Sequence, residues 1–290
     1  MDGYKRIPTA AASLSEALAL GRAFWQLTKP RVVALLVLTA WVGMMLASDG
    51  LPNLALMAVA SLGIAMVSGA AAAFNHVLDQ KIDARMARTR LRPLPTGRLR
   101  NAQAVSFAFA LAAAGFVLLL VAVNALTAVL TLAGLFGYAV VYTVFLKRAT
   151  PQNIVIGGVA GALPPVLGWT AMTGTVGAEA LLLMMIIFTW TPPHFWALAI
   201  HRVEDYRRAG LPMLPVTHGI AFTRTLVLLY TVLLLAVCLL PYLVGMSGLL
   251  YLAGSLVLNL QFLRHAWRLR FAPRADTAVR TFRFSITHLM

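Results

Sequence analysis

Apolar residues fill this chain in long runs, each bounded by Gly, Pro, Asn or a cluster of charges. The runs are rich in Leu, Ala, Val and Met and lack the alternation that is typical of β-strands. About 20 consecutive apolar residues cross a bilayer as a helix, which satisfies its own backbone hydrogen bonds in lipid. The pattern predicts eight membrane-spanning helices, over residues 31–48, 53–74, 102–122, 124–146, 152–173, 179–200, 223–245 and 248–266. A ninth apolar stretch, 282–290, is too short to cross, so we expect the last helix to be truncated or missing.

The composition agrees with an all-α fold, a polytopic transmembrane helical bundle. Hydrophobic residues make up 60% of the chain and charged residues 11%, whereas a soluble domain of 290 residues needs a more polar surface. The mean hydropathy is +0.83. The single cysteine, Cys238, lies inside an apolar run, which excludes a disulfide framework and a cysteine-based metal site. No compact apolar core with a cleavage site follows Lys5 and Arg6, so we expect no removed signal peptide.

The basic residues fall on one side of this predicted threading. Alternate threading places all 24 Lys and Arg residues in, or at the border of, one set of loops: 1–30, 75–101, 147–151, 201–222 and 264–283. The opposite loops carry only Asp49 and Glu179 as charges. By the positive-inside rule the N-terminus and the basic loops are cytoplasmic, in a cell inner membrane. Topology and the anionic lipid bilayer account for the net charge of +15, and no basic–aromatic module for nucleic acid is present.

Two of the basic loops, 75–101 and 201–222, differ from ordinary connectors. Each places a carboxylate just after an apolar run, continues through arginines and closes on Leu-Pro. We interpret this as a weak internal repeat, which is typical of two related loops that face one site. The chain then divides into an N-terminal cytoplasmic segment, 1–30, and one intramembrane domain, 31–290, whose chemistry lies in these loops.

Asn75, Asp79 and Asp83 are spaced four apart, so they share one face of a helix that continues out of the second span. Two carboxylates this close repel each other unless a cation lies between them, and Mg²⁺ binds such oxygens together with phosphate. Alternatively, both aspartates pair with neighbouring basic residues on a solvated helix. The scarcity of acids, nine in the chain, favours a metal site for a diphosphate on an apolar tail. The basic side chains that could grip the phosphates are Lys81, Arg88 and Arg92, and also Lys147 and Arg148, which otherwise snorkel at the end of the fourth span.

The second loop carries Asp205 as the counterpart of these aspartates and as a further candidate metal ligand. His201, four residues earlier, could hydrogen-bond a substrate. Tyr206 either contacts substrate or is an interfacial aromatic residue. His218 lies where the loop ends and could reach the mouth of a cavity.

The sixth predicted span contains an ionisable residue, His194, directly after Pro192 and Pro193. Two prolines break or kink a helix and free carbonyl groups, which is tolerated only where the backbone is buried or lines a cavity. His194 is therefore a functional candidate; the alternative is a buried histidine bonded to a freed carbonyl. The glycines of segment 153–169 predict close helix packing rather than phosphate binding.

Together these motifs resemble the UbiA superfamily of intramembrane aromatic prenyltransferases. The pattern Asn75-x3-Asp79-x3-Asp83, followed by arginines, is similar to the first aspartate-rich motif of that family. The segments 86–93, 153–169, 191–196 and 205–215 are similar to its heme-farnesylating branch. The resemblance extends from about Lys29 to His288 and rests on several separate motifs.

The resemblance implies a bundle of usually nine helices around a central cavity, with farnesyl diphosphate and heme b as substrates and Mg²⁺ as cofactor. The product would be heme O, used by a terminal oxidase or converted by a heme A synthase. Asn75, Asp79 and Asp83 would hold the first Mg²⁺–diphosphate, and Asp205 would supply the second motif. His201 stands where many family members have an aspartate, which argues against a full second metal site. Heme would be oriented by His194 or His218.

Two other functions are compatible with parts of the pattern. A prenyltransferase that acts on another aromatic or chlorin ring would carry the same aspartates and differ only in its acceptor. A polytopic transporter would keep charged residues near the middle of the bilayer, whereas this chain concentrates them at the predicted cytoplasmic ends.

Overall fold

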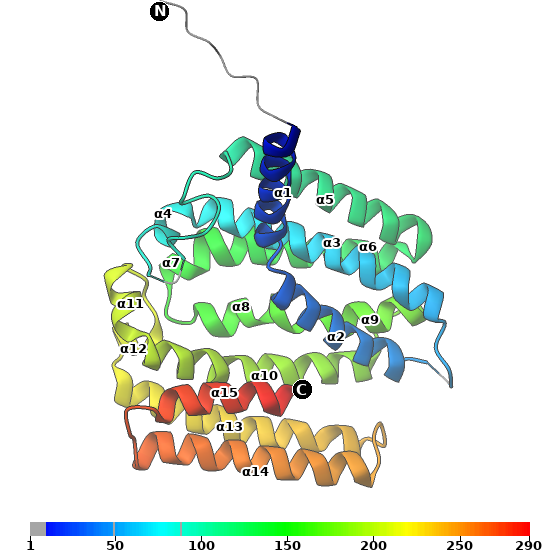
Figure 1. The fold of residues 1–290 in the computed structure, drawn as a ribbon. Helices are drawn as coiled ribbons and strands as arrows, with labels where there is room; N and C mark the ends of the chain where they lie inside the picture. Colours follow the sequence, from blue (N-terminus) through cyan, green and yellow to red (C-terminus); the bar gives the residue numbers. More distant parts are fainter. Residues whose placement is uncertain (1–9, 49, 88) are drawn as a thin grey trace, which may run out of the picture.

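The computed structural model describes residues 10–48, 50–87 and 89–290, and within these ranges the chain is built of helices without a strand (Figure 1). The helices are α1 (Ala10–Leu27), α2 (Pro30–Leu46), α3 (Leu54–Leu78), α4 (Gln80–Asp83), α5 (Asn101–Ala122), α6 (Ala125–Phe136), α7 (Lys147–Ala149), α8 (Asn153–Ala162), α9 (Pro164–Thr173), α10 (Ala178–His201), α11 (Val203–Arg208), α12 (Leu214–Thr217), α13 (Ile220–Leu243), α14 (Leu249–Phe271) and α15 (Thr277–Leu289). A π-helical segment, Gly137–Leu146, joins α6 to α7. The predicted all-α bundle is confirmed.

Six helical segments among the described residues are long and apolar enough to cross a membrane: Leu54–Leu78, Asn101–Ala122, Ala125–Ala149, Asn153–Thr173, Ala178–His201 and Ile220–Leu243. They match six of the eight predicted spans. Helix α2 reaches the required length only together with the end of α1, from which it is bent by 48°. Helix α14 carries arginines in its last turn and is not among the six. The count of eight therefore remains a prediction.

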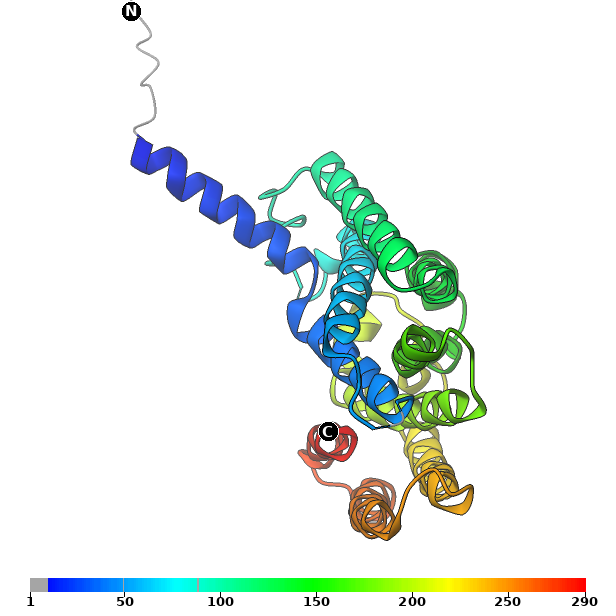
Figure 2. The ribbon, with the colours of Figure 1, turned by 90° about the vertical axis from the view of Figure 1, so that its right-hand side faces the viewer.

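Helix α1 was not expected from the sequence, because Glu16 and Arg22 interrupt its apolar residues. It projects away from the bundle and ends at the bend before α2 (Figure 2). Helix α15 begins before the predicted apolar stretch, at Thr277, and packs against α10 and α14.

Glycines bring α2 and α9 into backbone contact, as the segment 153–169 predicted. A Cβ atom on Gly168 would lie 1.9 Å from the carbonyl oxygen of Ala40, and one on Gly43 would lie 2.1 Å from that of Pro165. Both distances are shorter than any real contact. Small residues at these two positions therefore set how closely the helices approach.

Pro192 and Pro193, which were expected to break or kink the helix, do not break it. Helix α10 runs from Ala178 to His201 with both prolines inside it and buried. It packs against α8, α13 and α15, so tertiary packing holds the helix together where local propensity would end it.

Candidate functional site

The first aspartate motif lies where α3 ends. Asn75 is in the last turn of α3, Asp79 follows the helix with φ −91° and ψ 0°, and Asp83 closes the short α4. The chain turns at Asp79, so the single helical face expected for the motif is interrupted. Asp79 and Asp83 are nevertheless only 2% and 4% exposed. The alternative of two aspartates on a solvated helix is therefore wrong.

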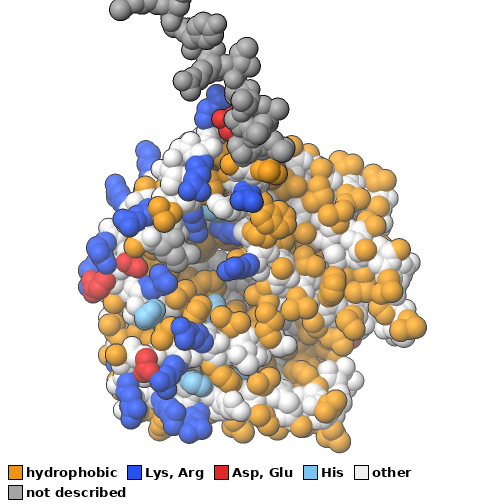
Figure 3. Space-filling view, in the orientation of Figure 1, with side chains coloured by type: hydrophobic (Ala, Val, Ile, Leu, Met, Phe, Trp, Pro, Cys, Tyr) orange, Lys and Arg blue, Asp and Glu red, His pale blue; other side chains and the backbone are white. Residues whose placement is uncertain are grey.

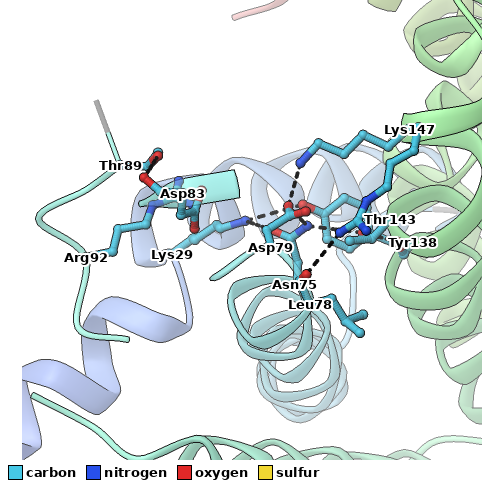
Figure 4. A network of polar contacts seen from close by, with 11 residues as sticks. Lys29, Asn75, Leu78, Asp79, Asp83, Thr89, Arg92, Tyr138, Thr143 and Lys147 are labelled. Carbon is cyan, nitrogen blue, oxygen red and sulfur yellow. Dashed lines mark hydrogen bonds and ion pairs between the residues drawn. The ribbon is translucent and has the colours of Figure 1, made fainter. Parts of the chain in front are cut away.

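Each buried aspartate pairs with a basic side chain that the sequence analysis proposed as a phosphate ligand. Lys147 Nζ lies 2.5 Å from Asp79 Oδ2, and Arg92 Nη1 lies 2.6 Å from Asp83 Oδ2 (Figure 4). Thr89 Oγ1 donates a hydrogen bond to the backbone carbonyl of Asp83 over 2.9 Å. A buried carboxylate is unfavourable unless it is paired, so these two cations stabilise the aspartate motif.

Lys29 is a site residue that the sequence analysis missed. Its Nζ donates to Asn75 Oδ1 over 2.6 Å and to the hydroxyl of Tyr138 over 3.4 Å (Figure 4). It precedes α2 with φ +49°, the only non-glycine residue with positive φ among those described, and such strain collects at functional sites. The sequence did contain a signal for Lys29: a lysine directly before an apolar helix is unusual, because the helix dipole disfavours a cation at that end.

The surroundings of Lys29 disfavour its charged form. Burial lowers the pKa of Lys29 to about 7; neighbouring Arg92 lowers it as well, while Asp79 raises it. Burial is the largest cause, so an anion that binds next to Nζ would raise the pKa of Lys29 again. The protonated ammonium group would then donate a charge-assisted hydrogen bond to the anion.

Asn75 connects α3 to the π-helical segment. Its Nδ2 donates to Asp79 Oδ2 over 2.8 Å and to Thr143 Oγ1 over 3.1 Å, and Thr143 Oγ1 donates to the carbonyl of Tyr138 over 2.8 Å. π-helical turns are frequent at functional sites. Here the widened turn carries Tyr138 and Thr143 to the end of α3.

The two carboxylates fit a magnesium ion whose remaining positions are filled by water and by a phosphate-containing ligand. Asp79 Oδ1 is buried without a hydrogen-bond partner in the described chain, and a second buried carboxylate, Asp83, follows one helical turn later. Among the described residues no three His, Cys, Asp or Glu side chains lie close enough to hold a metal by themselves. Mg²⁺ commonly uses one or two carboxylates and completes its shell with water and phosphate oxygens, which this arrangement allows.

The structure does not bring Asp205 into a common metal site with Asp79 and Asp83. On α11, Asp205 lies 3.2 Å from Arg208 Nη2 and 3.9 Å from Nη1 of Arg202, the residue before the helix, so its charge is balanced by arginines close in sequence. The neighbouring Glu204 pairs with Arg207.

The two loops do meet through apolar side chains. Met86 of the first loop and Leu211 of the second belong to one buried cluster, against which Ile82 and Tyr206 pack. This contact brings the loops side by side at one end of the bundle, as the prediction of two related loops that face one site requires.

The remaining predicted residues differ in their exposure. Lys81 and His201 are exposed, and Arg148 donates to the carbonyl of Leu78 over 3.3 Å. His218 is exposed, bonded to Thr217 and stacked on Phe222. Arg88 lies outside the described residues.

His194 is buried on the face of α10 that meets α15. Its Nδ1 lies 2.7 Å from Ser285 Oγ, and its ring stacks on Trp190 with centroids 4.2 Å apart. It lines a recess of about 170 Å³ together with Leu35 of α2 and Phe282 of α15. The partner at Nδ1 is a hydroxyl group and not the freed carbonyl that the alternative interpretation of His194 required.

A helical membrane bundle with buried aspartates and cations at one end of the spans is the architecture of an intramembrane prenyltransferase. The chain belongs to the UbiA prenyltransferase family, whose model matches residues 36–287. Similar relatives carry the name protoheme IX farnesyltransferase. The protein of Colwellia psychrerythraea is 60% identical over 278 residues, which cover 96% of this chain and 91% of the relative. That of Idiomarina loihiensis is 61% identical over 269 residues, covering 93% and 90%.

Solved structures share the fold at low identity. One, described as "Structural and mechanistic insights into the biosynthesis of Digeranylgeranylglyceryl phosphate synthase in membranes", has a TM-score of 0.78 and 18% identity and covers 93% of this chain and 94% of that chain. A UbiA homolog from Archaeoglobus fulgidus bound to GPP and Mg²⁺ has a TM-score of 0.65 and 16% identity and covers 92% and 96%.

Proposed function

We propose that this chain transfers a farnesyl group from farnesyl diphosphate to a vinyl group of heme b, giving heme O. The observation that carries the proposal is the buried cluster of Asn75, Asp79 and Asp83 with three cations, which suits a metal-bound diphosphate. The name shared by relatives at about 60% identity supports farnesyl diphosphate as donor and protoheme IX as acceptor.

The residues of the cluster have two roles in binding the diphosphate leaving group: the aspartates hold the metal, and the cations contact the diphosphate oxygens. Asp79, through its unpartnered Oδ1, and Asp83 would hold Mg²⁺. When bound, Mg²⁺ neutralises charge that develops on the departing diphosphate. Lys147 and Arg92 exchange their aspartate partners for diphosphate oxygens, and Lys29, directly before α2, adds a third cation. These groups stabilise the charge as the allylic carbon–oxygen bond breaks.

The bundle protects the farnesyl group from hydrolysis, because apolar helices surround the prenyl chain. A heme vinyl carbon then forms the new carbon–carbon bond. Water adds to the neighbouring carbon and releases a proton, which completes a hydroxyethylfarnesyl side chain. The first step needs no strong base, in agreement with a cluster made of metal ligands and cations.

Heme would bind at the recess between α2, α10 and α15. His194 supports this placement, because a hydrogen bond at Nδ1 fixes the ring and leaves Nε2 as the nitrogen for an iron ligand. His218 is also hydrogen-bonded at Nδ1, to its neighbour Thr217, but His201 and His218 are exposed on the loops, whereas His194 is buried and lines the recess. His194→Ala should weaken heme binding and change the heme absorption spectrum while farnesyl diphosphate binding persists. Normal heme affinity and spectrum in a folded variant would exclude His194.

The site would face the cytoplasm from an inner membrane, since the basic loops that carry it follow the positive-inside rule. Its diphosphate substrate is charged and would arrive from that side, whereas heme and the prenyl chain partition into lipid.

Product analysis tests the function directly. Purified protein is incubated with Mg²⁺, heme b and farnesyl or geranylgeranyl diphosphate, and the products are identified by mass spectrometry. We expect a heme product whose mass increases by one farnesyl group and one hydroxyl group. The same assay is repeated with a quinone or a chlorin in place of heme b. If only one of these is prenylated, that compound and not heme b is the acceptor. If no acceptor is prenylated, the proposal is refuted.

A further inference from the structure

A second polar site lies at the turn between α14 and α15, at the corner of the molecule where basic side chains gather (Figure 3). A cavity of about 200 Å³ opens there, and Arg268, Arg274 and Arg280 line it. Asp276 also lines it and pairs with Arg280 at 2.6 Å. Arg268 and Arg274 have no acidic partner among the described residues. The cavity therefore keeps an excess of two positive charges and suits an anion.

The cavity is separate from both substrate sites of the proposed reaction. Helix α14 lies on the opposite side of the bundle from α3 and α5 in both views (Figures 1 and 2). The recess beside His194 is divided from the cavity by α15 itself. At about 100° per residue, Thr277 and Arg280 point to one side of this helix, and Phe282 and Ile286, which line the recess, point to the other.

The surface beside the cavity is apolar and aromatic. Trp267 and Phe271 on the last turns of α14 are 57% and 54% exposed, and their ring centroids lie 4.3 Å apart. The guanidinium of Arg270 lies over the Phe271 ring at 5.1 Å. Aromatic side chains of this kind lie at the level of lipid headgroups, where one end of the ring is apolar and the other wet.

We propose that this cavity binds the phosphate of an anionic phospholipid, with Arg268 and Arg274 on the phosphate and an acyl chain along the aromatic surface of α14. Guanidinium groups bind phosphate oxygens in a bidentate manner, and basic pockets between membrane helices bind anionic headgroups. A soluble phosphate has no acyl chain for the aromatic pair, so the lipid is the favoured source of the phosphate.

The test compares lipids that differ in headgroup only. The purified full chain in detergent is titrated with phosphatidylglycerol or with phosphatidylcholine of the same acyl chains, and retained lipid is measured by native mass spectrometry. The variant is Arg268→Gln combined with Arg274→Gln. The control, Arg90→Gln combined with Arg98→Gln, removes the same charge from exposed positions of the first loop. Arg274→Gln alone is measured in parallel, because a single exposed loop substitution leaves the fold intact.

Each arginine near an anionic headgroup contributes about fivefold in affinity, so the double variant should bind phosphatidylglycerol about 25-fold more weakly. The single variant should lose about fivefold and the control should retain wild-type affinity. Equal losses in the variant and the control, or no loss in either cavity variant, would overturn the site. Displacement of the lipid by millimolar inorganic phosphate would overturn its assignment to a lipid, and a parallel loss of heme binding in the cavity variant would assign the cavity to heme carboxylates instead.

Discussion

The ion pair between Lys147 and Asp79 allows the structural and the catalytic contributions of the first aspartate motif to be measured separately. Its atoms lie 2.5 Å apart, and the two side chains are only 14% and 3% exposed. At 2.5 Å and an effective dielectric constant of about 20, the Coulomb attraction is about 7 kcal/mol. Desolvation costs several kcal/mol per ion and offsets most of this attraction.

The expected effects follow from which partner is left behind. Lys147→Met leaves a buried carboxylate without its cation, and Asp79→Asn leaves a largely buried ammonium group. Removal of one partner of a buried pair costs about 3 to 5 kcal/mol, and we expect the lower value because Asn75 still donates to Asp79. The double variant removes both charges, so its free energy of unfolding should return to within about 1 kcal/mol of the wild type.

Turnover should not return with stability. Asp79→Asn and the double variant both lack the carboxylate oxygen assigned to Mg²⁺, so both should be inactive while correctly folded. Unfolding is followed in mixed micelles with increasing denaturing detergent, and turnover by chromatography of the heme product. A control pair, Glu204→Gln and Arg207→Met on the exposed part of α11, should show a coupling energy below about 1 kcal/mol. Additive losses of stability at Lys147 and Asp79, or an active double variant, would refute this reasoning.

Three further predictions concern substrate binding, packing and topology. Lys29→Met should raise the KM for farnesyl diphosphate about tenfold or more in steady-state kinetics, because a charge-assisted hydrogen bond contributes about 1.5 to 3 kcal/mol; an unchanged KM would remove Lys29 from the site. Gly168→Ala should lower the free energy of unfolding by about 1 to 3 kcal/mol or more, whereas Gly161→Ala, which has open space around it, should not; equal stabilities would contradict the close approach of α2 and α9. Cysteines at Arg90 and Gly174, with the native cysteine replaced, should react from opposite membrane faces, and labelling from one face would overturn the threading.

The membrane-spanning helices could be read from the sequence because hydrophobicity along a segment is a local property. The predicted span 53–74 begins one residue before α3 and ends four residues before it does, and the predicted 102–122 differs from α5 by one residue at its start. The aspartates were found for a similar reason, since acids are rare in this chain and their spacing stands out. Local reasoning left two outcomes open at Pro192 and Pro193, a break or a kink, and the structure excludes the break, since α10 continues through both buried prolines.

The tertiary structure alone decided which groups meet. Lys147 reaches Asp79 across 68 positions of sequence, and Lys29 reaches Asn75 across 46. A π-helical turn brings Thr143 to the same asparagine, and the turn from α14 to α15 assembles a basic cavity from residues that looked like ordinary cytoplasmic charges. Charge and spacing in the sequence indicate the residue types that a site needs. Which side chains are buried and paired depends on how the helices pack, and packing is a property of the whole chain rather than of any single segment.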